Sequence, residues 1–362
     1  MTTDRNRNST HLPAHVTRPR LGWWHSFWRT ALLVGHGHQD LAVLSPSMPG
    51  PIRDLTVLIE TRRSEFAAIA RTRGADYKGG YWMMYLVAPL AVLCSALAAV
   101  AIGSGRVLAG IEFVMIVAIL LLFMAMRHGG WQERWIRARR TSEHLRYLPL
   151  VAPFVRNRTV NWYEDVAAHH GMRIIVDEEV TRMCLWLAQQ DAARSLRLDD
   201  RAFCAEYLTY VDALLRQQIA YHANNSDLEH ALSWRISLTS SIFFGVTILA
   251  TALLFLESLT ASLGIDHYLS PRMLRLCATV LPAIGAGLRG VLAQGESHRV
   301  AALSEGMAIR LAQLRDQIAK LPPTAAESGE LESLVWNAVQ ELLSEADTWM
   351  RLQESVPLSV AG

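Results

Sequence analysis

Four long apolar runs interrupt this otherwise charged sequence, and they limit the folds that it can adopt more than any other feature. An α-helix needs about 20 apolar residues to cross the roughly 30 Å hydrocarbon core of a bilayer. Three of the runs have that length, with at most one charged side chain each: residues 82–102, 107–126 and 236–256. One such run could be a buried helix of a soluble protein, but several in one chain indicate membrane-spanning helices.

The fourth apolar run is shorter and has a charged residue at each end. Residues 276–288 carry no charge, and Arg275 and Arg289 flank them. Long basic side chains near helix ends can extend to the headgroup layers. We therefore expect a fourth span at about 273–293, which makes the chain an all-α membrane protein with four transmembrane helices.

The connections between the runs predict two transmembrane helical hairpins with long cytoplasmic helices. Residues 103–106 form a tight turn between the first two runs, and residues 257–275 join the last two. A hairpin returns the chain to its starting side, so the segments outside the hairpins share one side. Basic residues that follow the second run place that side in the cytoplasm by the positive-inside rule: Arg127, Arg134, Arg137, Arg139, Arg140 and Arg146. We therefore expect a multi-pass protein of the inner (cytoplasmic) membrane, with both termini in the cytoplasm and the lipid bilayer as its first partner.

The hairpins divide the chain into five segments. They are residues 1–54, a partly disordered N-terminal cytoplasmic arm; 55–150, the first hairpin module; 151–233, a cytoplasmic helical segment; 234–321, the second hairpin module; and 322–362, a C-terminal helix and tail. The C-terminal helix carries an apolar stripe that includes Leu342 and Trp349. An apolar stripe at helical spacing also follows each hairpin, the second of them with Met307 and Leu311, and each of these two stripes contains a Ser-Glu pair, at 142–143 and 304–305. We interpret this as a weak internal duplication with a period of about 160 residues.

Composition and motifs argue against an enzyme. Hydrophobic residues make up 51% of the chain, and its mean hydropathy is positive at +0.17. The sequence contains no GxSxG, HExxH or Walker pattern, so we expect neither catalysis nor a cofactor. Four cysteines without a CxxC pair argue against a disulfide framework or a metal site: Cys94, Cys184, Cys204 and Cys277.

Several short stretches in a fixed order carry a family resemblance. They are WQERW (131–135), Glu143 in the following helix, WYED (162–165), LLRQQIAYHANN (214–225) and LPAIGAGLRGVLAQGE (281–296) followed by Ser-Glu. Together they resemble the SLATT superfamily, bacterial membrane proteins with two-helix hairpins that accompany nucleotide-sensing systems. The resemblance implies a pore-forming effector in a bacterial conflict or defence system. Its cytoplasmic motif residues here are Trp131, Glu133, Arg134, Trp135, Glu143, Gln218, Tyr221, His222, Glu296 and Glu305.

The N-terminal segment departs from that family pattern. Four-helix relatives often carry a sensor or signalling domain before the first hairpin, whereas only about 80 residues precede it here. The stretch GHGHQD (35–40) begins a GxGxxG pattern but has Asp40 at the third glycine position. A phosphate-binding loop needs that glycine for close helix packing, so we expect the trigger to come from a separate cytoplasmic sensor or signalling partner.

Polar residues within the apolar runs are the candidates for an ion path. Glu112 is the strongest, because an acid inside a membrane is costly and usually faces a bundle interior or water. Ser240, Thr247 and Thr251 could line the same path, although hydroxyls also bond back to helix carbonyls. Arg289 is best explained as a residue that extends to the headgroups. For His222, a structural hydrogen bond is favoured over proton sensing.

Small residues in the fourth span predict close helix packing. Ala283 with Gly287 and Ala286 with Gly290 form small-xxx-small pairs, and Pro282 can kink the helix. Two functions remain open. In one, the chain forms a homo-oligomer and opens a pore; in the other, it is a membrane-anchored helical scaffold that recruits a cytoplasmic partner without conducting. Neither involves nucleic acid.

Overall fold

Every element in the described part of this computed structural model is helical. The structure describes Trp23, Trp24, Phe27 and residues 48–100, 105–155, 162–169, 176–196, 198, 200–262, 270–321 and 329–355. The GHGHQD stretch at 35–40, with the prediction made for it, lies outside these residues. In chain order the helices are α2 (Gly50–Val100), α3 (Gly105–His128), α4 (Trp131–Val151), the short 3-10 helix η1 (Ala152–Phe154), α5 (Trp162–His169), α6 (Glu178–Gln189), α7 (Asp191–Ser195), α8 (Arg201–Ser262), α9 (Pro271–Gly295), α10 (Ser297–Ala319) and α11 (Glu330–Ser355).

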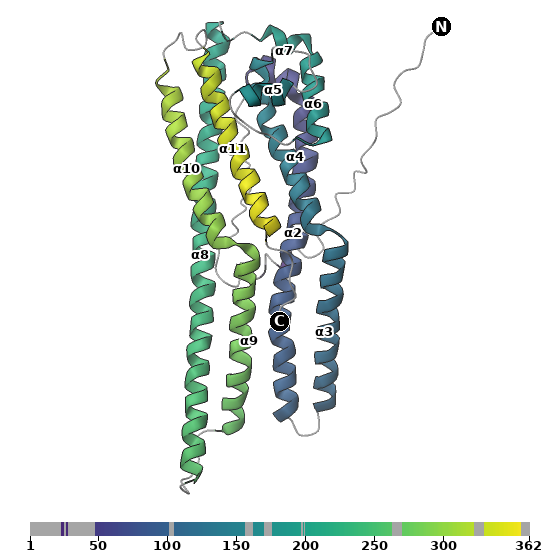
Figure 1. Ribbon diagram of the computed structural model, residues 1–362, viewed down its shortest axis with the longest axis vertical. Coiled ribbons are helices and arrows are strands. Elements are labelled where there is room, and N and C mark those ends of the chain that lie inside the picture. Colours follow the sequence, from purple (N-terminus) through teal and green to yellow (C-terminus); the bar gives the residue numbers. More distant parts are fainter. Residues whose placement is uncertain are drawn as a thin grey trace, which may run out of the picture.

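Two very long helices, α2 and α8, run through the whole molecule (Figure 1). They have 51 and 62 residues, and at 1.5 Å per residue they are about 77 and 93 Å long. At one end α3 and α9 pack beside them, and at the other end lie α4 to α7, α10 and α11. We call these ends the membrane part and the bundle part. α8 passes without interruption through the predicted segment boundary at 233/234 and continues beyond the predicted end of its span, to Ser262.

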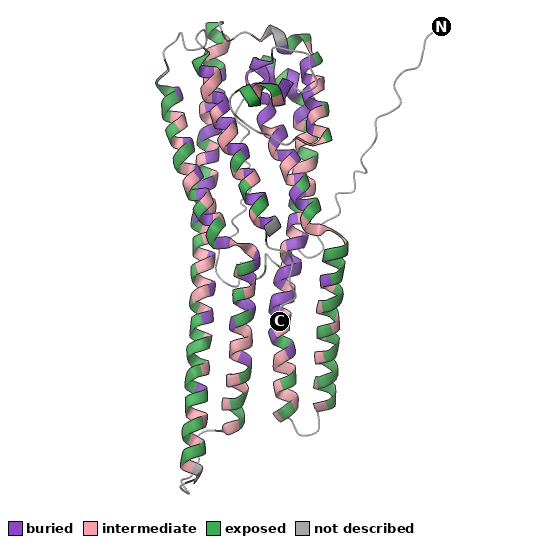
Figure 2. Cartoon of the chain, in the orientation of Figure 1, coloured by how far each residue is buried: buried purple, intermediate pink, exposed green. Residues whose placement is uncertain are grey.

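The membrane part contains four helices that are long and apolar enough to cross a bilayer, namely α2, α3, α8 and α9 with its continuation into α10. This confirms the expectation of a multi-pass, all-α membrane protein. Figure 2 shows that the residues of this part are mostly exposed or of intermediate exposure, apart from the stretch of α2 next to the bundle part, whereas buried residues concentrate in the bundle part. Exposed apolar side chains such as Phe113, Ile248 and Phe255 are expected where a helix faces lipid instead of water.

The membrane helices form an open row. α3 packs against α2, α2 against α9, and α9 against α8, and Figure 1 shows the same order. Within the described residues, α3 has no extensive contact with α8 or α9. Only 6% of the most apolar stretch of α3 or α8 is buried, compared with 28% for α2 and for α9. α3 and α8 are therefore the two edges of the row, and the described helices of one chain do not close around a channel.

The membrane helices α3 and α9 are each joined to the next helix of the bundle part through a residue in the left-handed conformation. Gly130, with φ 55° and ψ 41°, separates α3 from α4. Glu296, with φ 50° and ψ 29°, separates α9 from α10 and is the one non-glycine residue with positive φ in the described chain. The two breaks are 166 residues apart, close to the expected duplication period. The packing repeats as well, because α2 contacts α3 and α4 as α8 contacts α9 and α10.

The bundle part has an aromatic and aliphatic core. Its largest fully buried side chains include Trp162, Tyr163, Tyr207 and Trp336. Trp162 Nε1 donates a 2.7 Å hydrogen bond to the Cys184 carbonyl oxygen, and Tyr207 Oη donates one of 2.6 Å to the Leu150 carbonyl oxygen. Because these two buried polar atoms have partners, the rings of Trp162 and Tyr207 add apolar burial with little desolvation penalty, whereas the buried Tyr163 Oη has no hydrogen-bond partner among the described residues. The core therefore holds the upper ends of α2 and α8 in fixed positions.

Candidate functional site at the junction of bundle and membrane parts

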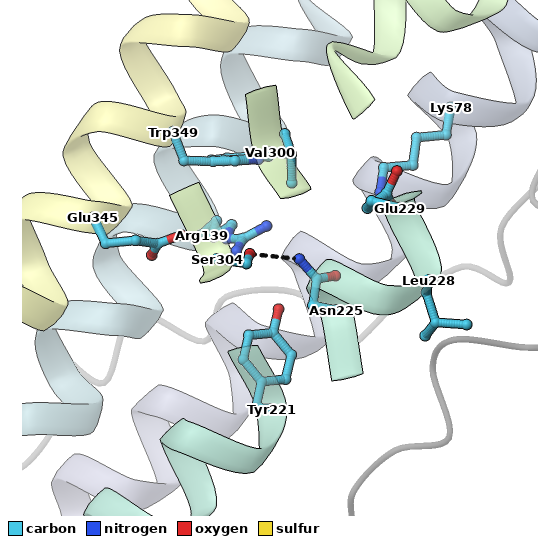
Figure 3. A pocket seen from close by; sticks show the side chains of 10 residues that line it. All are labelled: Lys78, Arg139, Tyr221, Asn225, Leu228, Glu229, Val300, Ser304, Glu345 and Trp349. Carbon is cyan, nitrogen blue, oxygen red and sulfur yellow. Dashed lines mark hydrogen bonds between the residues drawn. The ribbon is translucent and has the colours of Figure 1, made fainter. Parts of the chain in front are cut away.

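A pocket lies where five helices meet, just on the bundle side of the membrane part (Figure 3). Its volume is about 550 Å³ when the open mouth is included. α2, α4, α8, α10 and α11 supply ten lining residues: Lys78, Arg139, Tyr221, Asn225, Leu228, Glu229, Val300, Ser304, Glu345 and Trp349. It is therefore a polar pocket with charges of both signs and two aromatic side chains.

A chain of aromatic rings packs next to the pocket, and its last member, Trp349, lines it. The Tyr77 and Trp135 rings are 5.5 Å apart between centroids, and Trp135 meets Trp349 edge-on at 5.0 Å. A Cβ atom on Gly74 would lie 2.5 Å from Trp135 Nε1, so only glycine allows this close contact between α2 and α4. Lys78 Nζ lies 5.5 Å from the Trp135 ring centroid. Aromatic pairs of this kind add about 0.5–1.5 kcal/mol each beyond their buried area.

Arg139 occupies the centre of the pocket. Its guanidinium carbon lies 4.0 Å from the centroid of the Trp349 ring, a stacked cation–π geometry. Within the described residues the guanidinium has no hydrogen bond or ion pair to protein. Stacking uses the face of the guanidinium and leaves its N–H edge available, and Figure 3 shows this group among the pocket residues. An arginine held in this way can bind a carboxylate or a phosphate through two parallel hydrogen bonds.

Glu345 faces the same pocket from α11. The pKa of its carboxyl group is raised to about 7, chiefly by burial and also by Glu143, although Arg139 and Arg310 act in the opposite direction. In the part of the chain that the structure describes, this carboxyl group has no hydrogen bond or ion pair. Near neutral pH the group therefore exchanges between its neutral and charged forms.

Polar contacts next to the pocket connect the long helices to the bundle. Asn225 Nδ2 donates a 2.8 Å hydrogen bond to Ser304 Oγ and thereby joins α8 to α10. On α4, Arg146 pairs with Glu143 at 3.0 Å. Although burial opposes ionisation of Glu143, Arg146 and Arg139 hold the pKa of this carboxyl group below its usual range. Glu143 is therefore a fixed negative charge beside the pocket, in contrast to Glu345.

His222 is buried behind the pocket on α8. Its side chain is 4% exposed, and its Nδ1 atom has no hydrogen-bond partner. The pKa of the imidazole is lowered to about 4, chiefly by burial and also by Arg139, Arg146 and Arg310, although Glu143 acts in the opposite direction. The imidazole is therefore neutral across the physiological range. The structure shows no partner at Nδ1 for the hydrogen bond that the sequence favoured.

The ten motif residues of the family resemblance divide into two groups in the structure. Tyr221 lines the pocket, and Trp135, Glu143 and His222 lie next to its lining residues Trp349, Arg139 and Tyr221, respectively. Gln218 is buried one helical turn from His222. The other five lie outside the pocket. Trp131 is half-buried, Arg134 and Glu305 are exposed, and Glu133 pairs with Arg137 at 2.8 Å on an exposed face. Glu296 is the left-handed residue between α9 and α10.

The polar candidates in the membrane part lie apart from one another. Glu112 is half-buried on α3, one edge of the row, whereas the hydroxyl candidates are on α8, the other edge. Ser240 Oγ donates to the Gly285 carbonyl oxygen of α9 at 3.1 Å. Thr247 and Thr251 donate to carbonyl oxygens one turn earlier in α8, at 2.8 and 2.9 Å. Within one described chain, all three hydroxyls therefore serve helix packing or their own helix.

Arg289 contacts α8 as well as facing outward. Its guanidinium donates to Ser240 Oγ at 3.4 Å and to Ser237 Oγ at 3.5 Å, while the residue as a whole is exposed. The contact is weak at these distances. It nevertheless places a positive charge in the α8–α9 groove at the end of the membrane part nearest the bundle.

The small residues of α9 let this helix pack tightly against α2. A Cβ atom on Gly287 would lie 2.9 Å from Pro89 Cγ and closer still to the Tyr85 carbonyl oxygen. One on Gly290 would overlap the Tyr85 ring. Of the other predicted packing residues, Ala283 and Pro282 are half-buried and Ala286 is exposed. The contact between the two repeats therefore depends on the two glycines.

Sequence reasoning did not single out three of the central pocket residues, Arg139, Glu345 and Trp349, as functional. Arg139 was counted with the basic residues that set the topology. Trp349 was assigned to the apolar stripe of the last helix. One signal was present: Glu345 lies three residues after Leu342 and four before Trp349, so an acid interrupts an otherwise apolar helix face.

The fold and the site define an all-α, multi-pass membrane protein with a polar pocket at the base of its helical bundle. No protein-family model, curated protein or solved structure matches the chain.

Proposed function

We propose that this chain is an integral membrane effector of the SLATT type, with two transmembrane hairpins, that assembles into an oligomer and opens a pore. The observation that carries the proposal is the open row of membrane helices. Only 6% of the most apolar stretch of α3, and of α8, is buried within the chain, and neither helix has a neighbour beyond it in the row. A second copy could cover these edges and close a ring, so a path would form only between chains.

The long helices support a link between the bundle and the pore. α2 and α8 each continue from the bundle part into the membrane part without a break. A packed helix moves largely as a rigid rod, so a rearrangement at the pocket would shift its membrane segment. The proposal therefore assigns the pocket to reception of the trigger and Glu112 to the ion path.

The proposed location is the inner membrane of a bacterium, with both termini in the cytoplasm. The support is the cluster of arginines after α3, because basic residues are retained on the cytoplasmic side. A separate sensor or signalling protein would then reach the bundle part from the cytoplasm. The proposal requires neither a cofactor nor catalysis.

One observation favours the alternative, a membrane-anchored scaffold without conductance. Ser240, Thr247 and Thr251 all donate to helix carbonyl oxygens, so α8 offers few free hydroxyls to water or ions. In this alternative the membrane helices only anchor the bundle, and a cytoplasmic partner carries out the response.

Ion flux from liposomes distinguishes the two functions. Purified protein would be reconstituted with a trapped potassium-sensitive dye, and flux measured with and without candidate nucleotides; growth and membrane potential would be followed in cells that overexpress the protein. The pore predicts flux and depolarisation that Glu112→Ala abolishes and Gly110→Ala preserves, since Gly110 is two residues away with open space around it. Absence of flux, together with a cellular effect that survives replacement of the membrane segments by unrelated ones, would establish the scaffold instead.

A further inference from the structure

The charges that line the pocket suggest the kind of molecule that it holds. Arg139 and Lys78 are positive, while Glu229 and Glu345 are acidic. Among the described residues, Arg139, Glu229 and Glu345 make no hydrogen bond or ion pair with protein. Arg139 and Glu345 act on each other electrostatically, so an anion bound to Arg139 would be repelled by the nearby acid, and a cation bound to Glu345 would be repelled by Arg139. Like charges in a confined site repel, so a ligand with one charge of each sign fits best.

The pocket is also polarised along the axis of the molecule. α8 runs toward the membrane part and α10 runs away from it. The apolar lining residues Leu228 and Val300 are therefore nearer the membrane than Asn225 and Ser304 on the same two helices. Tyr221 lies farther still into the bundle. A molecule with an apolar attachment on the membrane side and a polar group on the bundle side matches this order.

The membrane-facing rim of the pocket lies at the level of lipid headgroups. Lys78 is four residues before the first apolar run and Glu229 is seven before the third, which at 1.5 Å per residue is about 6 and about 10 Å. The polar layer on each side of the hydrocarbon core is roughly 5–8 Å thick. Lys78 therefore lies within the headgroup layer, and Glu229 and the inner end of the pocket lie just above it.

We infer that this pocket binds a small zwitterion in which a phosphate is joined to a primary ammonium group, the chemistry of a phosphoethanolamine headgroup. Arg139 holds the phosphate through its free N–H edge, assisted by the positive charge of Lys78. Glu345 accepts hydrogen bonds from the ammonium group. The inference rests on the membrane placement in the proposed function but not on conductance.

Three lipids that differ in one feature each provide the test. The full chain, purified in detergent and stripped of lipid, is titrated with short-chain phosphatidylethanolamine, phosphatidylcholine or phosphatidylglycerol, and thermal unfolding is followed by tryptophan fluorescence. A ligand that binds only the folded state raises the unfolding temperature. We expect phosphatidylethanolamine to raise it clearly more than the other two, because a quaternary ammonium has no N–H to donate and glycerol carries no cation.

Matched variants connect the effect to the pocket. Arg139→Gln and Glu345→Gln should each weaken phosphatidylethanolamine binding on the order of tenfold, the loss expected for a charged hydrogen bond. Arg137→Gln is the control, because Arg137 lies on the same helix but faces solvent in an ion pair with Glu133. If a glutamine variant does not fold, native mass spectrometry of lipid retained by the wild-type chain gives the same comparison among lipids.

Each outcome has a defined meaning. Stabilisation by O-phosphoethanolamine alone would identify a soluble source of the headgroup, and stabilisation by the lipid alone would identify the bilayer. Equal stabilisation by all three lipids, unchanged binding in both pocket variants, or stronger stabilisation by inorganic phosphate or a nucleotide would overturn the inference. Flux in liposomes is a separate measurement, so a chain that conducts but ignores phosphatidylethanolamine refutes only the ligand.

Discussion

Replacing Gly287 by alanine tests the contact between the two helix repeats. The added Cβ atom would lie 2.9 Å from Pro89 Cγ, and the nearer Tyr85 carbonyl oxygen belongs to the backbone of α2. Carbon atoms pack optimally at about 3.5–4.0 Å, so α9 and α2 must separate by roughly 0.6–1 Å. A gap of that size loses about a quarter to a half of the dispersion energy along the contact.

The expected net effect is a loss of about 1–2 kcal/mol. Overpacking costs about 1–3 kcal/mol, and the better helix propensity of alanine offsets up to about 1 kcal/mol. Gly245→Ala is the matched control, since nothing lies within 4 Å of its added Cβ on α8. Unfolding in mixed micelles, followed by circular dichroism, should show Gly287→Ala less stable and Gly245→Ala equal to or more stable than wild type. Equal stability of the two variants would refute the close contact between α2 and α9.

Three further substitutions test the pocket and the helix breaks. Burial raises the pKa of Glu345 from 4.5 to about 7. The stability of wild type relative to Glu345→Gln should therefore be greatest below pH 4.5 and fall by up to about 3 kcal/mol as the pH rises through 7. Thermal unfolding of both proteins between pH 4.5 and 8.5 measures this difference, and a difference that does not change with pH would contradict the prediction. A left-handed residue other than glycine costs roughly 1–2 kcal/mol. Glu296→Gly should therefore stabilise the chain by about 1 kcal/mol, although it loses a 3.4 Å ion pair between the half-buried Glu296 and the exposed Arg299. Gly130→Ala should destabilise it by a similar amount, and a change of the same sign in both variants would contradict the shared geometry.

The elements that were easiest to predict are those that depend on neighbours along the sequence. Apolar length alone identified four helices that can span a membrane. Helical spacing identified the packed faces of the two last helices, where Met307, Leu311, Leu342 and Trp349 are indeed buried. These features follow from the 3.6-residue period and from the thickness of a bilayer, both of which act locally.

The pocket could not be predicted in this way, because its residues come from five helices. Arg139 and Arg137 lie two residues apart on the same helix, yet one stacks on Trp349 while the other pairs with Glu133 in solvent. Only the docking of α11 against α4 separates their roles. A single sequence carries no direct information on that contact, although the acid at 345 on an apolar face was a visible sign of a special environment.

The open row of membrane helices also has a cause that the sequence showed only in part. Small residues in the fourth span predicted a close contact but not its partner, and the structure places Gly287 and Gly290 against Tyr85 and Pro89 of α2. This contact puts the two inner helices, α2 and α9, side by side and leaves α3 and α8 at the edges. Glu112 is consequently on one edge and Thr251 on the other, so the two candidates for an ion path can face each other only across an interface between chains. The arrangement within one chain therefore makes self-assembly a requirement of the proposed pore.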